Sequence, residues 1–257
     1  MRKKVEEQHA ILILLQVRGV VGVGTAYSGD EVTANVILND AKSVYDGNFN
    51  VVYDNAVLKL ESYNICSALS ASSVQVNTEY GENKARVTFA GTSEVNTGTM
   101  VSFVFKVISD NKETAALEIS DANMYNVSGN SLDTTVQNTN ITIKKSDYTI
   151  NSIYLMNEDN EYLDRVDGLD KFYAGIRFNK NSADMQRPTI VFAIYDENDN
   201  LADIKIAENR YSQGEGLECE VMFNTLGNYT PSYIAAFIFD DFENIKPMCG
   251  KFVREDI

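Results

Sequence analysis

The sequence has a single histidine, His9, no tryptophan and only three prolines. Because the histidine lies near the N-terminus and stands alone, Ser-His-Asp and Cys-His nucleophiles lack their base, and common metallohydrolase sites lack their ligands. The three cysteines, Cys66, Cys219 and Cys249, form no C-x-x-C pair, so no zinc site is indicated. We therefore expect neither a bound metal nor another cofactor.

Positive charge is also scarce, since 22 Lys and Arg residues stand against 37 Asp and Glu residues and give a net charge of −15. Nucleic acids and anionic membranes bind clustered cations, so both are excluded as partners. Glycoside hydrolysis by two carboxylates is the remaining enzymatic hypothesis. However, the acidic clusters at 158–159, 196–199 and 240–241 lie where we expect strand ends and turns. We predict that the protein is not an enzyme.

Residues 196–203, DENDNLAD, place oxygen-bearing side chains at alternate positions, as calcium loops do. They lack the central glycine and the distal glutamate of an EF-hand loop. We predict strands at 191–195 and 201–206, which a turn within this segment would join as a hairpin tip. A calcium site is the alternative.

What the chain has in abundance is the two-residue alternation of β-strands. Phe49, Val51 and Tyr53 alternate with mostly polar neighbours, and the same spacing returns between Val101 and Val107. No long stretch has helical spacing. An all-β fold with two β-sandwiches is therefore expected.

Four phrases occur in a particular order: Gly29-Asp30-x-Val32, Phe49-x-x-x-Tyr53-Asp54-x-x-x-Leu58, Phe89-Ala90-Gly91, and Gly98-x-x-x-x-Phe103-x-Phe105-x-Val107. In this order they resemble the cohesin domain. The resemblance implies a nine-stranded jelly-roll sandwich over residues 29–145 that binds the dockerin module of a secreted polysaccharide-degrading enzyme. Calcium would belong to the dockerin, and since the chain has no duplicated calcium loop, it would be the receiving partner.

In cohesins the dockerin lies on one sheet face, against outward side chains of neighbouring strands. We assume that the apolar residues of the two strands point inward, namely Phe49, Val51, Ala85, Val87 and Phe89. The residues that alternate with them then point outward. These predicted partner-binding residues are Asp46, Asn48, Asn50, Lys84, Arg86 and Thr88. Val52, Val104 and Leu69 are candidates for an apolar centre of this face.

Two other functions stay open. Some carbohydrate-binding modules share this sandwich, and they hold polysaccharide on a flat row of aromatic rings. Tyr45, Tyr63, Tyr80 and Tyr125 could supply rings, although they lack regular spacing. A structural cell-surface adhesion protein, which binds neither dockerin nor glycan, is the third hypothesis.

The second half begins after the polar joint at 144–147 and contains eight short apolar segments with turns between them. We expect an immunoglobulin-like sandwich over residues 146–257. Its closing stretch, 234–248, resembles accessory β-domains in secreted proteins of gut Firmicutes, which implies a spacer or stabilising role. Cys219 and Cys249 form a disulfide or stay as isolated thiols.

Residues 1–28 resemble a signal peptide, with Arg2 and Lys3 before the apolar run 10–15 and cleavage after Ala26. The alternative is a partial first strand at 17–26. The run is too short to span a membrane. We predict a secreted, extracellular protein, and the chain as a fragment of a larger scaffold is a further alternative.

Overall fold

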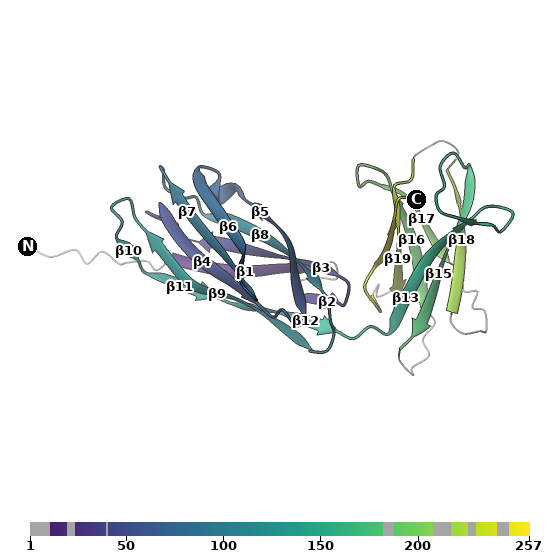
Figure 1. Ribbon diagram of the computed structural model, residues 1–257, viewed down its shortest axis with the longest axis horizontal. Helices are drawn as coiled ribbons and strands as arrows, with labels where there is room; N and C mark the ends of the chain where they lie inside the picture. Colours follow the sequence, from purple (N-terminus) through teal and green to yellow (C-terminus); the bar gives the residue numbers. More distant parts are fainter. Residues whose placement is uncertain are drawn as a thin grey trace, which may run out of the picture. The chain divides into compact units, whose positions relative to one another are not determined.

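The structure is a computed structural model that describes residues 11–19, 24–39, 41–181, 188–207, 217–225, 230–240 and 247–257. The chain divides into two compact units, Met1–Lys144 and Lys145–Ile257, and the division falls in the polar joint at 144–147. Figure 1 shows that both units are built of strands. Among the described residues the only helix is the short 3-10 turn η1 (Ser67–Leu69). The all-β prediction is confirmed.

The first unit is a sandwich of two sheets, drawn in purple to teal in Figure 1. The five-stranded sheet runs in the order β11 (Thr134–Gln137), β1 (Ile11–Gly19), β3 (Glu31–Asn39), β8 (Gly98–Val107) and β5 (Leu58–Ile65). The seven-stranded sheet runs β2 (Thr25–Tyr27), β12 (Thr139–Lys144), β9 (Thr114–Tyr125), β4 (Asp46–Tyr53), β7 (Lys84–Gly91) and β6 (Ser72–Gly81), with β10 (Ser131–Leu132) on β9. Phe49 and Phe89 from one sheet and Phe103 and Phe105 from the other are buried in one core.

Alternation decides which side chains enter this core. In β3 every second residue from Val32 to Leu38 is buried, and the phrase around Phe103 in β8 follows the same rule. A strand that faces a core on one side has this pattern because successive side chains point to opposite faces. The resulting architecture agrees with the jelly-roll sandwich expected for this half of the chain.

The turn between β2 and β3 explains the Gly29-Asp30 phrase. Gly29 has φ +95°, in the left-handed region that favours glycine. The buried carboxylate of Asp30 accepts a hydrogen bond from the backbone N–H of Tyr27 at 2.9 Å. The backbone of Asp30 also accepts from the N–H of Val107 at 2.8 Å. The phrase therefore closes the turn and joins it to β8.

The structure treats the N-terminal apolar run differently from the signal-peptide interpretation. Residues 11–19 form β1, which pairs antiparallel with β3 and parallel with β11, and Ala26 is buried in β2. Cleavage after Ala26 would remove β1 and cut β2. The first strand also differs from the alternative at 17–26, because residues 20–23 lie outside the described residues between the two strands. No helix in the described ranges is long and apolar enough to cross a bilayer.

The second unit has two four-stranded sheets, which agrees with the expected second β-sandwich. One sheet runs β14 (Tyr162–Leu163), β13 (Tyr148–Met156), β15 (Lys171–Lys180) and β18 (Leu217–Asn224). The other runs β17 (Leu201–Ala207), β16 (Thr189–Tyr195), β19 (Tyr233–Phe239) and β20 (Phe252–Glu255). Phe172, Phe178, Phe192 and Phe223 are fully buried between them.

Of the segment at 162–166, only Tyr162–Leu163 forms a strand. The guanidinium of Arg254 donates hydrogen bonds to the carbonyls of Leu163 at 3.0 Å and Asp164 at 2.8 Å. These carbonyls are thereby satisfied by a side chain in place of a neighbouring strand.

We predict that Asp30→Ala lowers the free energy of unfolding of the first unit by about 1–3 kcal/mol, because the N–H of Tyr27 loses its buried acceptor. Asp30→Asn keeps an acceptor oxygen and should cost less. Chemical denaturation of both variants measures this, with Asp133→Ala, an exposed carboxylate in the same unit, as the control. Equal stability of Asp30→Ala and wild type would contradict the role of this turn.

Candidate partner-binding face

The six predicted partner-binding residues lie together on two neighbouring strands, β4 and β7. In their antiparallel register Asn48 is opposite Thr88 and Asn50 is opposite Arg86. Phe49, Val51, Ala85, Val87 and Phe89 between them are buried in the core, so the six polar residues point to the outer face of the sheet. We call the outer side of β9, β4, β7 and β6 the polar face. The structure shows the grouping of the six residues, and their role in binding stays a prediction.

Arg86 is the centre of the polar face. Its Nη2 donates to Oδ1 of Asn48 at 2.9 Å, and its Nη1 donates to Oδ1 of Asn50 at 3.1 Å. The guanidinium carbon also lies 5.0 Å from the centre of the Tyr80 ring on β6, a cation–π distance. Two amides and one ring therefore fix the position of this cation.

Asn50 is 1% exposed although it lies on the outer side of β4. A register shift in the pairing of β4 with β9 places Asp121, at φ +49°, beside it. The Nδ2 of Asn50 donates to Oδ2 of Asp121 at 2.6 Å, so the amide connects a carboxylate on one side with Arg86 on the other. Burial of this polar side chain is compensated by hydrogen bonds in both directions.

The other members of the group have different surroundings. Asp46 accepts a hydrogen bond from the backbone N–H of Gly91 at 3.2 Å, at the end of the β4–β7 pair. Lys84 lies opposite Val52 at the other end, and Thr88 is exposed. Of the apolar candidates only Val52 belongs to this face, since Val104 lies on β8 in the other sheet and Leu69 is buried in the core.

Sequence reasoning missed Asp121 and Asn123, and it named Tyr80 only as a candidate ring for sugar binding. Asn123 donates from Nδ2 to Oδ1 of Asn48 at 3.4 Å. The one signal for Asp121 and Asn123 is the break in alternation after Ser120, where the strand continues as Asp-Ala-Asn before Met124 enters the core. Such a break is typical of a β-bulge, which redirects side chains.

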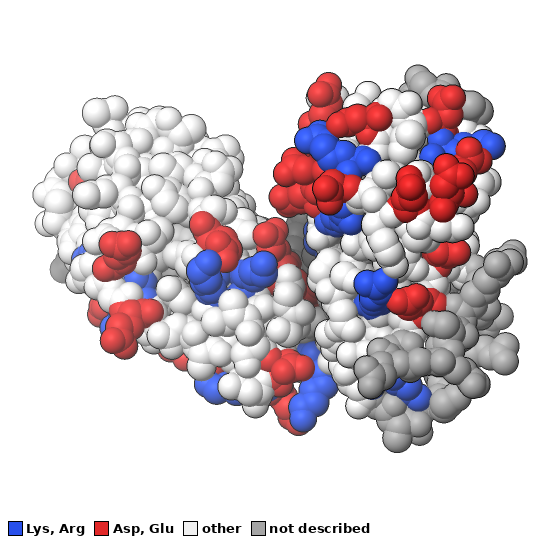
Figure 2. All heavy atoms as spheres, turned by 45° about the vertical axis from the view of Figure 1, so that its right-hand side comes forward, with Lys and Arg blue, Asp and Glu red and all other residues white. Residues whose placement is uncertain are grey.

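Charge is distributed unevenly over the molecule. On the face drawn in Figure 2, a broad part of the first unit carries no charged side chain, whereas acidic side chains gather with basic ones on the second unit. In the sequence, residues 62–78 contain no charged side chain at all. Glu79 and Glu82 separate this neutral stretch from the cations Lys84 and Arg86.

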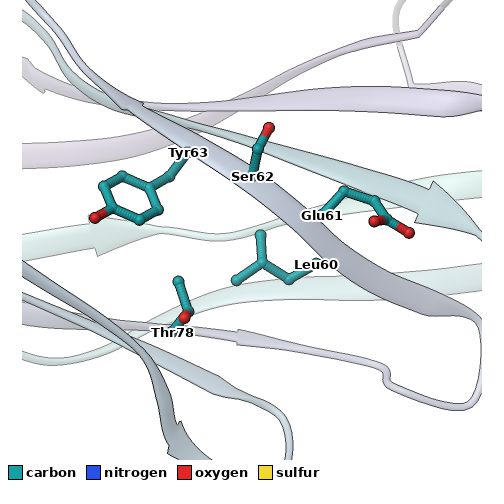
Figure 3. A pocket seen from close by; sticks show the side chains of 5 residues that line it. All are labelled: Leu60, Glu61, Ser62, Tyr63 and Thr78. Carbon is teal, nitrogen blue, oxygen red and sulfur yellow. The ribbon is translucent and has the colours of Figure 1, made fainter.

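A shallow pocket of about 330 Å³ lies between β5 and β6, the edge strands of the two sheets of the first unit. Figure 3 shows Leu60 and Tyr63 on the same side of β5 as Thr78 of β6, with Ser62 on the other side. Its Glu61 forms an ion pair with Lys59 at 2.9 Å. Binding sites for small molecules have several polar groups that converge on the ligand, and this pocket does not. We assign it no ligand.

The stretch 196–203 contains the tip of the β16–β17 hairpin. Oδ1 of Asp196 accepts from the backbone N–H groups of Asn198 and Asn200, both at 2.9 Å. These bonds, together with the amide of Asn200, lower the pKa of Asp196. The carboxylate closes the turn, and within the described ranges no three His, Cys, Asp or Glu side chains are placed to hold a metal ion.

Cys66, Cys219 and Cys249 form no disulfide with one another. Cys219 and Cys249 are buried in the core of the second unit, and burial raises the pKa of the Cys219 thiol to about 12. Cys66 is half-buried in the first unit, with its Sγ 3.3 Å from Oγ of Ser102. The structure thus has no Cys219–Cys249 disulfide.

The family model described as the cohesin domain matches residues 18–144. Solved structures with a similar fold include a non-cellulosomal cohesin from Archaeoglobus fulgidus, at 21% identity over 53% of this chain and 92% of that chain, with a TM-score of 0.45. A cohesin in a type I cohesin–dockerin complex from Clostridium thermocellum is 17% identical over 53% of this chain and 100% of its own, also at 0.45. A type II cohesin domain from Acetivibrio cellulolyticus is 17% identical over 52% and 95%, at 0.43. The chain matches no curated protein.

We predict that Asn50→Ala destabilises the first unit by about 1–3 kcal/mol, because Arg86 and Asp121 each lose a hydrogen-bond partner. Thr88→Ala on the neighbouring strand is the control and should change stability by less than about 0.5 kcal/mol. Urea denaturation of the two variants measures the difference. Equal stabilities would show that the network adds nothing to the fold.

The native protein should expose one reactive thiol. At pH 8 the raised pKa of Cys219 leaves almost none of it as thiolate, and Cys249 is buried, so we expect Cys66 to react with Ellman's reagent first. Unfolding in denaturant should release all three. Rapid reaction of Cys219 in the native state, located by peptide mapping, would contradict its placement in the core.

Proposed function

We propose that the polar face of the first unit, whose residues 18–144 match the family model of the cohesin domain, binds a dockerin module. The dockerin would belong to a secreted polysaccharide-degrading enzyme and would bring its own calcium. The chain would act outside the cell as a non-catalytic receptor for that enzyme.

The family match supports the partner class. Cohesin domains are protein-binding modules without catalytic activity, and two of the similar Clostridium thermocellum structures are cohesin–dockerin complexes. We infer the extracellular setting only from the kind of partner. The apolar run that resembled a signal peptide does not support it, because residues 11–15 of that run lie in β1.

The fixed position of Arg86 carries the proposal. Asn48, Asn50 and Tyr80 hold the guanidinium on an outward sheet face. No carboxylate of the described residues forms an ion pair with it; its amide partners are neutral, so its positive charge remains for a partner. A side chain that is already fixed loses little conformational freedom on binding. A helix that presents acceptor oxygens could therefore form charge-assisted hydrogen bonds here.

The same face does not suit a polysaccharide. Tyr80, whose ring centre lies 5.0 Å from the guanidinium carbon of Arg86, is the one aromatic group among the described residues that contact this cation. The strands around it present amides, hydroxyls and charges in place of a row of rings. A protein surface with complementary polar groups is the better fit.

The test is a binding screen of the full chain against a panel of purified dockerins, with calcium and with a chelator. We expect calcium-dependent binding to at least one dockerin, because the dockerin folds on that ion. In Asn48→Arg/Arg86→Glu the affinity should fall by about a hundredfold or more, since the variant reverses the central charge and adds bulk.

Two further variants make the test specific. Thr88→Arg adds bulk to the polar face without breaking the Arg86 network and should also weaken binding. Lys106→Glu on β8 reverses a charge on the other sheet and should leave the affinity unchanged. If no dockerin binds, the receptor function is wrong; if the face variants bind like wild type, the position of the site is wrong.

A further inference from the structure

The outer face of the β14-β13-β15-β18 sheet in the second unit carries a row of aromatic and thioether side chains. Tyr162 pairs with Met156, Met156 with Tyr173, and Tyr173 with Met222, so the four lie side by side across four strands. None of them belongs to the core cluster of the unit. Tyr162 is 64% exposed and Met222 is 47% exposed. The row therefore lies outside the core, and its two ends are exposed, whereas Met156 is 8% exposed and Tyr173 is half-buried.

A glycine makes room for a third ring beside this row. Tyr154 is opposite Gly175 in the register of β13 and β15. A Cβ at Gly175 would lie 2.2 Å from the Tyr154 ring, so the ring lies directly over the glycine backbone. Tyr154 is thereby buried on a face that is otherwise outside the core.

Arg177 fixes Tyr162 against Tyr154. Its Nη2 donates to the Tyr162 hydroxyl at 2.7 Å, and its Nε donates to Oε1 of Glu218 at 2.7 Å. The guanidinium carbon lies 5.2 Å from the Tyr154 ring centre and 5.6 Å from the Tyr162 ring centre. The two rings meet edge to face at 5.8 Å. Tyr162 is thus exposed to solvent and held by three separate contacts.

Polar groups stand next to the fixed ring. Glu218 and Glu220 on β18 lie opposite Arg177 and Gly175, on the same outer face. Burial raises the pKa of Tyr154, and the two glutamates raise it further, so its phenol stays protonated. Around the row the sheet therefore offers guanidinium donors, carboxylate acceptors and phenol groups.

We propose that this face, which we call the tyrosine platform, binds a neutral polysaccharide. A pyranose ring has apolar C–H faces and an equatorial rim of hydroxyls. The Tyr162 ring can stack on the sugar face, while Arg177, Glu218 and Glu220 can bond vicinal hydroxyls. Two carboxylates against one guanidinium disfavour acidic polysaccharides.

The other sheet of the same unit shows the contrast. Its β17 carries the exposed aliphatic residues Leu201, Ile204 and Ile206. Aliphatic side chains offer a sugar neither a flat π-face nor hydrogen bonds. The Tyr195 and Tyr233 rings of this sheet are only partly exposed and stack on each other at 4.7 Å, whereas Tyr162 on the tyrosine platform is 64% exposed. The proposal is independent of dockerin binding, because the platform lies wholly in the second unit.

The experiment measures retention of the full chain on insoluble cellulose, xylan and mannan, and titration calorimetry with the matching soluble oligosaccharides. Polygalacturonate is the acidic comparison. We expect wild type to bind at least one neutral glycan and to bind polygalacturonate more weakly. Tyr162→Ala should weaken binding by about tenfold or more, and Tyr162→Phe should keep most of it, because the stacking ring remains.

Tyr63→Ala is the matched control, since Tyr63 is a partly exposed tyrosine in the pocket of the first unit. It should bind like wild type, and Arg177→Gln should bind more weakly than wild type. Thermal unfolding of each variant verifies the fold. The proposal is overturned if no neutral glycan binds, if Tyr162→Ala binds as wild type does, if Tyr63→Ala alone loses binding, or if polygalacturonate binds best.

Discussion

The two-residue repeat of the extended strand is the constraint on which both units depend. In β4, Phe49 and Val51 enter the core, and the residues between them must therefore point to the opposite face. The same rule in β13 sends Leu155 inward and Tyr154 outward. Once the core of a sandwich is chosen, the surface that a partner meets is fixed at the same time. One set of alternate positions in a strand therefore packs the core, and the other set forms the outer surface.

Much of the fold follows from this repeat and could be predicted from the sequence. The alternation around Phe49 and Phe103 is visible in the chain. The grouping of Asn48 with Arg86 was implied by the resemblance to cohesins, and the alternation then selected the outward residues. The strand β1 was harder to predict from the sequence. A strand that pairs on both edges within a sheet and the apolar core of a leader are both short unbroken apolar runs, and sequence spacing does not separate them.

The contacts that hold the two faces in place lay beyond sequence reasoning. The bond between Asn50 and Asp121 joins residues 71 positions apart and depends on an irregular register between β4 and β9. Likewise, the contact of Arg177 with Tyr162 requires the registers of β14, β13 and β15 together. A glycine such as Gly175 signals close approach only when the ring above it is known. Local patterns define strands, whereas these networks depend on how strands are paired.

The polar face and the tyrosine platform each contain an arginine that lies over tyrosine, but the two arginines differ in whether their charge is compensated. Arg86 and Arg177 each lie over tyrosine rings on an outer sheet face. The partners of Arg86 are the neutral amides of Asn48 and Asn50, so its charge remains available to a partner. Arg177 instead forms an ion pair with Glu218 at 2.7 Å, and its charge is compensated within the sheet. An uncompensated cation favours a polar protein surface with acceptor groups, whereas a compensated one beside an exposed ring favours an uncharged ligand. The choice of amide or carboxylate on the neighbouring strand therefore distinguishes the ligands that we propose for the two units.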